Sequence, residues 1–317
     1  MRKSLLVLFL SVSFYSFSQT DPMFTHYMYN GLFLNPGSTG IGISEKPVTE
    51  FGTLVRLQWI GIEGAPRSQV FWGHTPISKI NSGIGIHVFN DNAGPLHQLT
   101  VNLDYAYHLE IGDGILGIGP SLGILNNALD GTMLKPNDVD PILPKSGKSE
   151  MKFDLSAGAW YKAKKYYVGL SSLHLIPNEY NFSDLAASPS KYEVPFHFYL
   201  TGGYHFDITR EIDLTPSLIA KNTKSITQFE GSAMAGYNKR FYFGLAYRQL
   251  ESASVLVGFN FLKDNAAHFG YSYDFILNDL NTVSSGSHEF LLTYSIPKKI
   301  VLPPAKIIIR TPRFRLE

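Results

Sequence analysis

A stretch in the first third of the chain decides the fold: residues 99–109 read Leu-Thr-Val-Asn-Leu-Asp-Tyr-Ala-Tyr-His-Leu. Every odd-numbered position in it is a large apolar residue or a tyrosine, and every even-numbered position is threonine, asparagine, aspartate, alanine or histidine. Successive side chains of a β-strand point to opposite faces of the sheet. The stretch therefore predicts a strand with one apolar face and one polar face.

The same alternation recurs along most of the chain, from a first run at 50–60 to a last run at 287–296. With the weaker runs between them included, fourteen strands are predicted. An even number of antiparallel strands returns the chain to the side where it began. Predicted tight turns at 112–114, 163–165, 209–210, 238–239 and 264–265 alternate with longer connections at 126–151, 176–194 and 277–286. Short turns on the periplasmic rim and longer loops outside are typical of outer-membrane barrels.

Composition separates a membrane barrel from a soluble β-sandwich. The 317-residue chain is 14% aromatic and only 17% charged, whereas soluble domains carry about 25% charged residues. The polar faces of the predicted strands are mostly glycine, serine, threonine, asparagine and histidine, which suits a crowded wet lumen better than a solvent-facing sheet. The sequence therefore predicts an all-β fold, a transmembrane antiparallel β-barrel of about 14 strands of the outer-membrane type.

The N-terminus has the order of a secretory signal peptide, predicted over residues 1–18. Arg2 and Lys3 precede an apolar, serine-spaced stretch, and the small residues Ser16 and Ser18 favour cleavage before position 19. A membrane helix is the alternative, but it needs about 20 apolar residues. Because the chain contains no cysteine, a lipoprotein anchor is excluded. We expect the protein to reside in the outer membrane.

The rest of the chain divides into three parts. Residues 19–49 form a predicted periplasmic N-terminal segment, residues 50–296 form the barrel, and residues 297–317 form a basic periplasmic tail with six basic residues against one acidic residue. In the N-terminal segment, Tyr29, Leu32 and Phe33 recur at helical spacing. This spacing predicts a short docked helix or plug, with a flexible leader as the alternative.

The polar faces of the predicted strands place a set of polar and charged side chains in the lumen. They are Arg56, Gln58, Asp104, Arg248, Asp274 and Glu289. Since an unpaired strand edge is prohibitively costly in lipid, the first and last strands are expected to pair. Arg56 and Glu289 would then stand at similar depth on the same face, which predicts a contact between them across the seam.

No catalytic, metal or cofactor site is predicted. The absence of cysteine removes disulfides, cysteine-ligated metals and thiol catalysis, and the ten histidines are not at metal-ligand spacings. Ser287, His288 and Glu289 have the residue types of a hydrolase triad. Adjacent strand residues point to opposite faces, however, so the histidine points away from the other two. With 27 basic and 26 acidic residues, the chain has no general attraction for nucleic acid.

Short motifs, in order along the chain, are similar to those of one known family. They are Asp21-Pro-Met-Phe-Thr-His-Tyr-Met-Tyr-Asn30 with Asn35-Pro36-Gly37, Arg56-Leu-Gln-Trp59, Gly83-Ile-Gly-Ile-His87 with Asp91 and Gly94, Tyr105-Ala-Tyr-His108, Gly270-Tyr-Ser-Tyr-Asp274 and Gly286-Ser-His-Glu289. As a set they resemble the PorP/SprF family of type IX secretion system membrane proteins. The positions that best carry the resemblance are Asn35, Pro36, Asp91, Gly94, Tyr273, Asp274, Ser287, His288 and Glu289.

The resemblance implies a role in type IX protein secretion. Members of the family either belong to the general machinery or handle one exported partner, typically a large surface adhesin, through its C-terminal signal domain. The expected partners are therefore outer-membrane lipid, that exported protein, and periplasmic or outer-membrane components of the secretion system. The loops at 126–151 and 176–194 are expected to meet the exported partner. A general porin or solute channel is the alternative function, since about fourteen strands falls between filled and open barrels.

Overall fold

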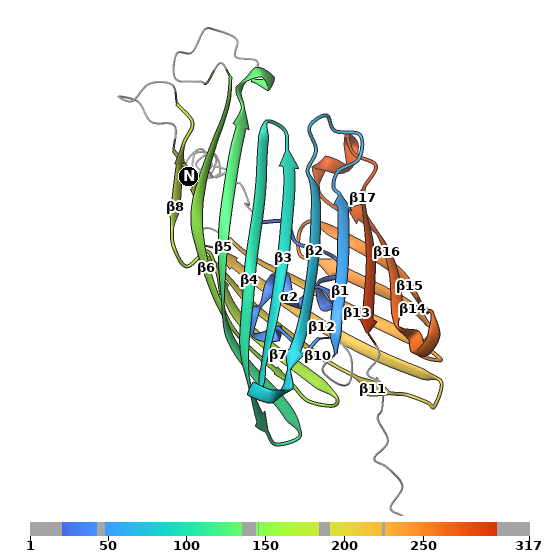
Figure 1. Cartoon of the computed structure of the whole chain (residues 1–317). Coiled ribbons are helices and arrows are strands. Elements are labelled where there is room, and N and C mark those ends of the chain that lie inside the picture. Colours follow the sequence, from blue (N-terminus) through green and yellow to red (C-terminus); the bar gives the residue numbers. More distant parts are fainter. Residues whose placement is uncertain are drawn as a thin grey trace, which may run out of the picture.

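Fifteen strands of the computed structural model join in one sheet that closes on itself as a barrel (Figure 1). The structure describes residues 21–42, 48–134, 144, 146–183, 191–223 and 226–296. The two-residue strand β11 (Phe206–Asp207) continues β10 along the same neighbour, β12, so the barrel wall consists of fourteen strands. The predicted strand number is therefore confirmed.

Neighbouring strands of the wall are antiparallel throughout. The strands are β1 (Thr49–Leu57), β2 (Arg67–Ile77), β3 (Ser82–Ala93), β4 (Leu96–Ile111), β5 (Gly114–Asp130), β6 (Gly147–Lys162), β7 (Tyr166–Leu173), β10 (His197–Tyr204), β12 (Ile212–Thr223), β13 (Thr227–Tyr237), β14 (Phe241–Arg248), β15 (Ser252–Phe261), β16 (Ala267–Ile276) and β17 (Ser287–Ile296). The first strand pairs with the last, with Thr49 opposite Ile296. This pairing closes the barrel, as a lipid environment requires.

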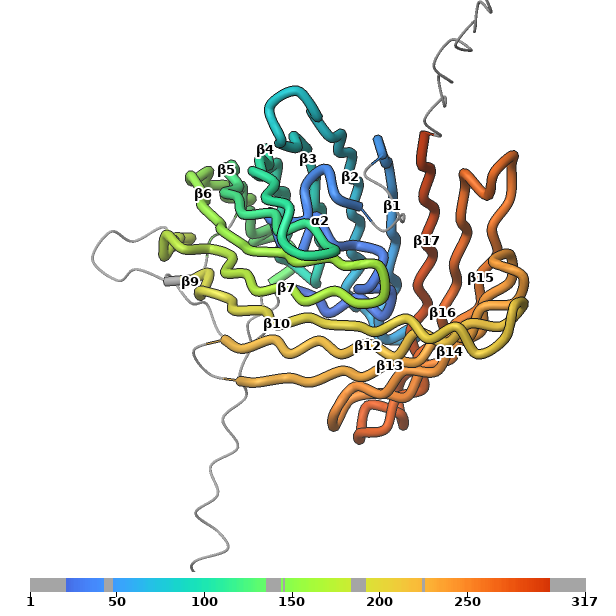
Figure 2. The backbone as a smooth tube through the Cα atoms, turned by 90° about the horizontal axis from the view of Figure 1, so that it is seen from below, coloured from blue at the N-terminus to red at the C-terminus, as the bar shows by residue number. Residues whose placement is uncertain are grey.

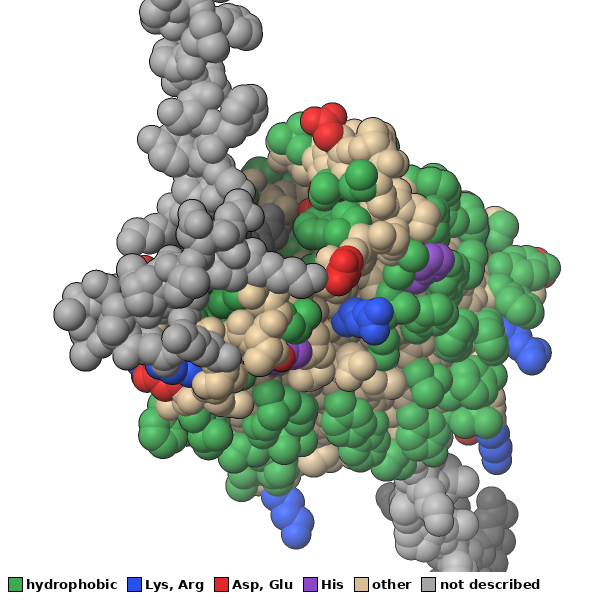
Figure 3. All heavy atoms as spheres, turned by 90° about the horizontal axis from the view of Figure 1, so that it is seen from above, with side chains coloured by type: hydrophobic (Ala, Val, Ile, Leu, Met, Phe, Trp, Pro, Cys, Tyr) green, Lys and Arg blue, Asp and Glu red, His purple; other side chains and the backbone are tan. Residues whose placement is uncertain are grey.

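The two faces of the wall differ as the alternation predicts. In β4, Leu103 is 64% exposed, whereas its neighbours Asn102 and Asp104 are only 8% and 3% exposed. The contrast is repeated around the wall, and hydrophobic side chains crowd its outer surface when the barrel is seen from above (Figure 3). An apolar belt of this extent is far larger than the patches that soluble monomers expose, and it suits contact with hydrocarbon.

The two ends of the barrel differ in the length of their connections. One end, called the turn end below, carries short links such as residues 112–113 and 163–165 together with Thr49 and Ile296, where the barrel strands begin and end. The other end, called the loop end, carries the connections from β5 to β6, from β7 to β10 and from β16 to β17. This asymmetry is the one predicted from the sequence.

Two of the predicted loops differ from the expectation. Strands β5 and β6 stay paired as far as Asp130 and Gly147, so the connection predicted at 126–151 is confined to the residues between them. Within the connection predicted at 176–194, β8 (Asn178–Asn181) and β9 (Lys191–Val194) form a separate antiparallel hairpin. The apolar alternation has faded in both places, but pairing still satisfies the backbone N–H and C=O groups.

The helices in the described ranges are all short. Four 3-10 helices lie in the connections: η3 (Ser78–Ile80), η4 (Gly131–Met133), η5 (Lys263–Asn265) and η6 (Asp279–Thr282). Within the part of the chain that the structure describes, no helix has the length and apolar character needed to cross a membrane.

Residues 21–42, called the leader below, lie inside the barrel (Figure 2). They contain the 3-10 helix η1 (Tyr27–Tyr29), one α-helical turn α2 (Gly31–Leu34) and the 3-10 helix η2 (Pro36–Ser38). The single helix suggested by the apolar spacing does not form, because the backbone leaves helical geometry at Asn30, where φ is −108° and ψ is 46°.

The position of the leader revises the expected domain layout. Residues 19–49 were expected on the periplasmic side of the barrel, whereas the described leader is enclosed by the wall itself. Enclosure buries the aromatic side chains that a segment outside the barrel would leave in water. The predicted signal peptide (1–18) and basic tail (297–317) lie outside the described residues.

Candidate functional site

The leader runs along the barrel from one end to the other. Asp21 contacts His174 and His197, which flank the connection between β7 and β10 at the loop end. The main-chain oxygen of Gly42 accepts a hydrogen bond of 2.8 Å from Lys162 Nζ, at the last residue of β6 and hence at the turn end. The leader therefore occupies the lumen over much of its length.

Apolar side chains of the leader form a core with the wall. Phe24, Leu32 and Phe33 are 2–5% exposed and belong to one cluster with wall residues such as Trp72 and Phe89. The rings of Phe24 and Phe33 meet edge to face at 5.6 Å, and the rings of Phe33 and Phe89 are 5.2 Å apart. Burying a phenylalanine or leucine side chain stabilises by about 1.5–3 kcal/mol, so this core alone binds the leader firmly.

Thr25 of the leader joins a buried group of charged residues at the loop end, called the charged cluster below: Arg56, Glu230, Arg248, Glu251, Asp274 and Glu289. Its hydroxyl donates to Asp274 at 3.0 Å and accepts from Arg56 Nη1 at 3.1 Å. Its main-chain N–H donates to Glu289 Oε2 at 3.0 Å, and the N–H of His26 donates to Glu289 Oε1 at 2.8 Å. Thr25 is fully buried, so one small side chain of the leader completes the hydrogen bonding of several wall charges.

Arg56 and Arg248 each bind two carboxylates of the charged cluster. Arg56 lies 2.7 Å from Asp274 and 3.0 Å from Glu289, and Arg248 lies 2.7 Å from Glu230 and 2.9 Å from Glu251. Charge-assisted hydrogen bonds of this length are the strong ones in proteins. Arg248 Nη2 also donates to the main-chain oxygen of Met23 at 3.1 Å, so both arginines hold the leader as well as the wall.

The charged cluster contains more carboxylates than guanidinium groups. Burial alone would raise the pKa of Glu251, which lies between β14 and β15, but the Arg248 guanidinium lowers that pKa below its ordinary value. Arg56 Nε and Glu230 Oε1 are buried and have no hydrogen-bond partner among the described residues. Such atoms are costly to bury, which makes the remaining pairings of the cluster essential to its stability.

A second polar group fixes the first residue of the leader that the structure describes. Asp21 Oδ2 lies 2.7 Å from His197 Nδ1 and 3.1 Å from His174 Nε2. The main-chain oxygen of Asp21 accepts a hydrogen bond of 2.5 Å from Lys221 Nζ, and His174 Nδ1 lies 3.0 Å from Asp154 Oδ2. Burial alone would raise the pKa of Asp21, but His197 and His174 hold it well below its usual range.

Near the turn end the leader passes directly against the backbone of the wall. Asn35 Nδ2 donates to the main-chain oxygens of Ala159 at 3.0 Å and Leu170 at 3.2 Å. A Cβ on Gly158 would stand 2.0 Å from Asn35 Oδ1. A Cβ on Gly117 would stand 2.1 Å from the main-chain oxygen of Gly37 in the leader. The backbone of the wall at Gly117 therefore lies very close to the backbone of the leader.

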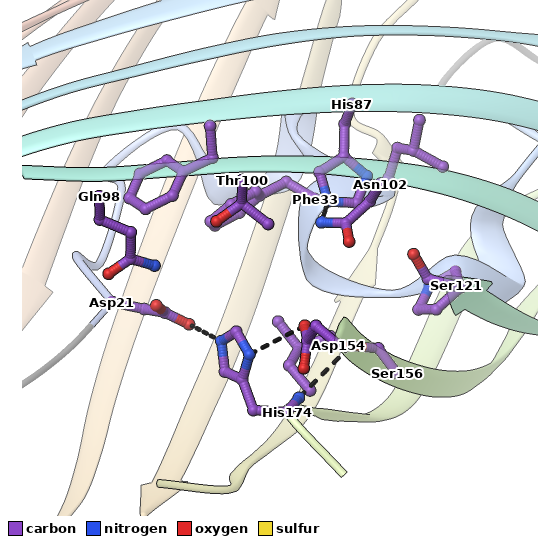
Figure 4. Close-up of a pocket in the computed structure, with 14 residues that line it drawn as sticks. Asp21, Phe33, His87, Gln98, Thr100, Asn102, Ser121, Asp154, Ser156 and His174 are labelled. Atoms are coloured by element: carbon purple, nitrogen blue, oxygen red, sulfur yellow. Dashed lines mark hydrogen bonds and ion pairs between the residues drawn. The ribbon is translucent and has the colours of Figure 1, made fainter. Parts of the chain in front are cut away.

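Two small cavities adjoin the leader. One, of about 20 Å³, lies beside Phe33 and His174 (Figure 4). The other, of about 60 Å³, lies beside Met28 and Trp160. A water molecule needs about 10–15 Å³ of such volume, so each cavity has space for no more than a few waters.

The predicted luminal residues are distributed over three places. Arg56, Arg248, Asp274 and Glu289 lie together in the charged cluster, and the predicted contact between Arg56 and Glu289 is present. Asp104 is buried elsewhere in the lumen, 2.8 Å from His87. Gln58 lies just beyond the end of β1 and is half-buried, so the structure does not bring it into the charged cluster.

The family-motif positions have mainly structural contacts. Asn35 and Pro36 lie at the start of η2, Asp91 accepts a hydrogen bond from Ser68, and Gly94 has a φ of +56° in the link from β3 to β4. Asp274 and Glu289 belong to the charged cluster, and the hydroxyl of Tyr273 donates to the main-chain oxygen of Ser285.

The Ser287-His288-Glu289 stretch is not arranged as a hydrolase triad. Ser287 and Glu289 are buried on the luminal side, whereas His288 is half-buried and lies 2.8 Å from the hydroxyl of Tyr271. Ser287 Oγ accepts a hydrogen bond from the main-chain N–H of Trp59. The alternation of a regular strand thus separates the histidine from the other two residues.

Several residues of the site have no sequence signal of their own. Thr25 and Asp21 stand only within a longer motif, and no pattern in the sequence distinguishes His174 and His197. Lys221 and Glu230 are each 1% exposed in strands whose alternation is weak. One feature of the sequence indicates Lys221 and Glu230: each is a charged residue at a position of its strand that faces the lumen.

A closed barrel with an apolar outer belt and a polar lumen defines an outer-membrane β-barrel protein. The sequence profile of a family described as type IX secretion system membrane protein PorP/SprF matches residues 16–294. The chain therefore belongs to the PorP/SprF family, as the motifs indicated, and its location is the outer membrane. A comparison with curated proteins gives no significant match.

Solved structures share the barrel. The toluene transporter TbuX of Ralstonia pickettii is 12% identical, with a TM-score of 0.51 over 84% of this chain and 93% of that chain. The toluene transporter TodX of Pseudomonas putida is 11% identical, with a TM-score of 0.50 over 88% of this chain and 95% of that chain. At these identities the likeness shows the fold alone.

Proposed function

We propose that this protein is a plugged barrel of the type IX secretion system that binds an exported partner and does not pass solutes through its lumen. The partner would be a large adhesin-type surface protein, held through its C-terminal signal domain. The observation that carries the proposal is the leader, which fills the lumen and is bound to the wall near both ends. Membership of the PorP/SprF family supplies the secretion context.

The contacts of the leader favour binding over diffusion. A solute path along the lumen would require the leader to leave, and this would strip Thr25 from the charged cluster and Asp21 from its two histidines. Breaking buried charged contacts of this kind costs about 3–5 kcal/mol. A resident plug held in this way argues against the porin alternative.

The loop end offers a tall strand surface for a partner. Strands β4, β5 and β6 have 16, 17 and 16 residues, whereas β7 and β14 have 8 each. The hairpin of β8 and β9 packs on this taller wall through Tyr180, Phe182 and Val194, which cluster with Leu125 of β5. We infer that the exported partner docks on this wall and its hairpin, and that the turn end and the tail at 297–317 meet the periplasmic components.

Affinity purification from native membranes, followed by mass spectrometry, tests the proposal. The wild-type barrel should recover a large surface protein that carries its C-terminal domain. Replacement of residues 176–193 by a short glycine–serine linker should abolish this recovery, while the same replacement at 278–285 should leave it unchanged. Failure of the wild-type protein to recover any surface protein, together with a steady open pore in bilayers, would support the porin instead.

A further inference from the structure

Three metal-ligating side chains converge where the leader meets the loop end. Their donor atoms, on Asp21, His174 and His197, all lie within 4.8 Å of one another. The three residues are 0–7% exposed. They come from the leader, from the position after β7 and from the first residue of β10, so the fold brings together residues that are far apart in the sequence.

We propose that Asp21, His174 and His197 form a binding site for a divalent transition-metal ion, with zinc as the expected occupant, which fastens the leader to the barrel wall. The site is independent of the exported partner, and it goes beyond the proposed function. It also revises the expectation, drawn from histidine spacing alone, that no metal site is present.

The distances suit a small ion with short bonds. Asp21 Oδ2 lies 3.1 Å from His174 Nε2 and 2.7 Å from His197 Nδ1. A tetrahedral zinc ion with bonds of about 2.0–2.1 Å separates its ligand atoms by about 3.3 Å. To admit the ion, Asp21 Oδ2 would have to move away from His174 Nε2 by about 0.2 Å and from His197 Nδ1 by about 0.6 Å.

The donor set selects the kind of metal. Two imidazoles and one carboxylate are typical ligands of zinc and of other first-row transition metals. Calcium and magnesium prefer all-oxygen sites with more ligands. The site is thus not expected to bind these hard cations in preference to zinc.

A neighbouring carboxylate orients one of the histidines. Asp154 Oδ2 lies 3.0 Å from His174 Nδ1 and leaves Nε2 of the same ring directed at Asp21. Metal-binding histidines almost always donate their second ring N–H to a carboxylate or carbonyl in this way. With a metal ion on Nε2, this contact would hold the neutral ring in the tautomer that carries its proton on Nδ1.

Space and polar groups are available beside the site. The cavity of about 20 Å³ next to His174 has room for one water, which would serve as a fourth ligand. Figure 4 shows Gln98, Thr100, Ser121 and Asp154 around this space. Each of them has a buried polar atom without a hydrogen-bond partner among the described residues, so the cavity is built for a polar occupant.

Metal analysis of the folded wild-type barrel tests the proposal without any substitution. The barrel is stripped with a chelator, dialysed and titrated with zinc, and binding of one ion per chain is expected. Cobalt(II) in place of zinc should give the visible absorption bands of a tetrahedral nitrogen and oxygen site. Zinc should also slow hydrogen exchange at residues 21–25, because the ion fixes the end of the leader.

Three variants separate a metal site from a hydrogen-bonded cluster. His174→Ala combined with His197→Ala should abolish stoichiometric zinc binding, and Asp154→Asn should weaken it about 10- to 100-fold. His74→Ala is the matched control, since His74 is also buried and bonds the leader through the N–H of Gly40, but it should leave zinc affinity unchanged. Strand content by circular dichroism verifies that each variant is folded.

The opposite results are equally clear. Wild-type protein that binds no zinc at micromolar concentrations, or that binds it as well after loss of both histidines, would overturn the proposal. Cobalt bands typical of an octahedral aqua ion would do the same. The proposed secretion function does not depend on either result, because the partner-capture experiment uses no metal readout.

Discussion

Arg56 and Glu289 face each other across the seam where the first and last strands close the barrel. The two residues are opposite in the register, and Arg56 Nη1 lies 3.0 Å from Glu289 Oε2. The same carboxylate oxygen accepts the main-chain N–H of Thr25 at 3.0 Å. One ion pair therefore takes part both in closing the barrel and in holding the leader within it.

Removal of the Arg56 guanidinium should destabilise the barrel strongly. Arg56→Ala leaves Asp274 and Glu289 as buried charges without their shared partner, and we expect a loss of about 3–5 kcal/mol in the free energy of unfolding. Urea titration of the barrel in lipid vesicles measures this loss. Arg67→Ala, at an exposed position at the start of β2, is the control and should stay within about 0.5 kcal/mol of wild type.

The hydroxyl of Thr25 should be needed to keep the leader in place. Thr25→Val keeps the shape but removes a group that bonds Asp274 and Arg56, and we expect leader opening to become easier by about 1–3 kcal/mol. Hydrogen exchange of residues 23–33 reports this change. Thr25→Ser retains the hydroxyl and should exchange almost as slowly as wild type. Equal protection in the valine variant would show that the hydroxyl does not anchor the leader.

A side chain at Gly158 should push the leader away from the wall. Its Cβ would stand 2.0 Å from Asn35 Oδ1, so Gly158→Val forces the Asn35 side chain to move and to give up its hydrogen bonds to Ala159 and Leu170. We expect faster protease cleavage within residues 35–42, with the barrel strands still intact. Gly147→Val on the same strand is the control, since a Cβ there meets no atom within 4 Å, and its cleavage pattern should match wild type.

Acid should weaken the charged cluster in part through Glu251. The folded-state pKa of this group is lowered by Arg248, so its contribution to stability is present above the unfolded pKa and is lost as the pH falls through the folded one. Wild-type stability should therefore fall more steeply than that of Glu251→Gln between about pH 5 and pH 3. Parallel curves for the two proteins would rule out this contribution.

Most of the barrel wall could be predicted from the sequence, because apolar and polar residues alternate with a period of two along each strand. Residues such as Leu103 and Asp104 alternate strictly between the outer and inner faces, so faces, strand number and even the pairing of Arg56 with Glu289 follow once the sheet is required to close. The ends of β5 and β6 were misplaced, because pairing there continues to Asp130 and Gly147 after the apolar signal has stopped. The first strand ends at Leu57, before the predicted end at residue 60.

The position of the leader inside the lumen could not be predicted in the same way. The leader has no regular period, and its path depends on contacts with nearly every part of the wall. Asp21 meets His174 and His197 at sequence separations of 153 and 176 residues, and no local spacing reports a meeting of that kind. The segment of the leader that approaches Gly117 of the wall could likewise be identified only in three dimensions.

The conductance of single barrels in planar bilayers decides whether the leader is a plug. It is measured for the full protein and for a variant without residues 21–42, with Gly158→Val as a second way of displacing the leader and circular dichroism as the check on folding. We predict no stable conductance for the full protein, a steady pore for the deletion variant and intermittent openings for Gly158→Val. A steady pore in the full protein, as large as the one in the deletion variant, would contradict a plugged barrel that works by holding a partner.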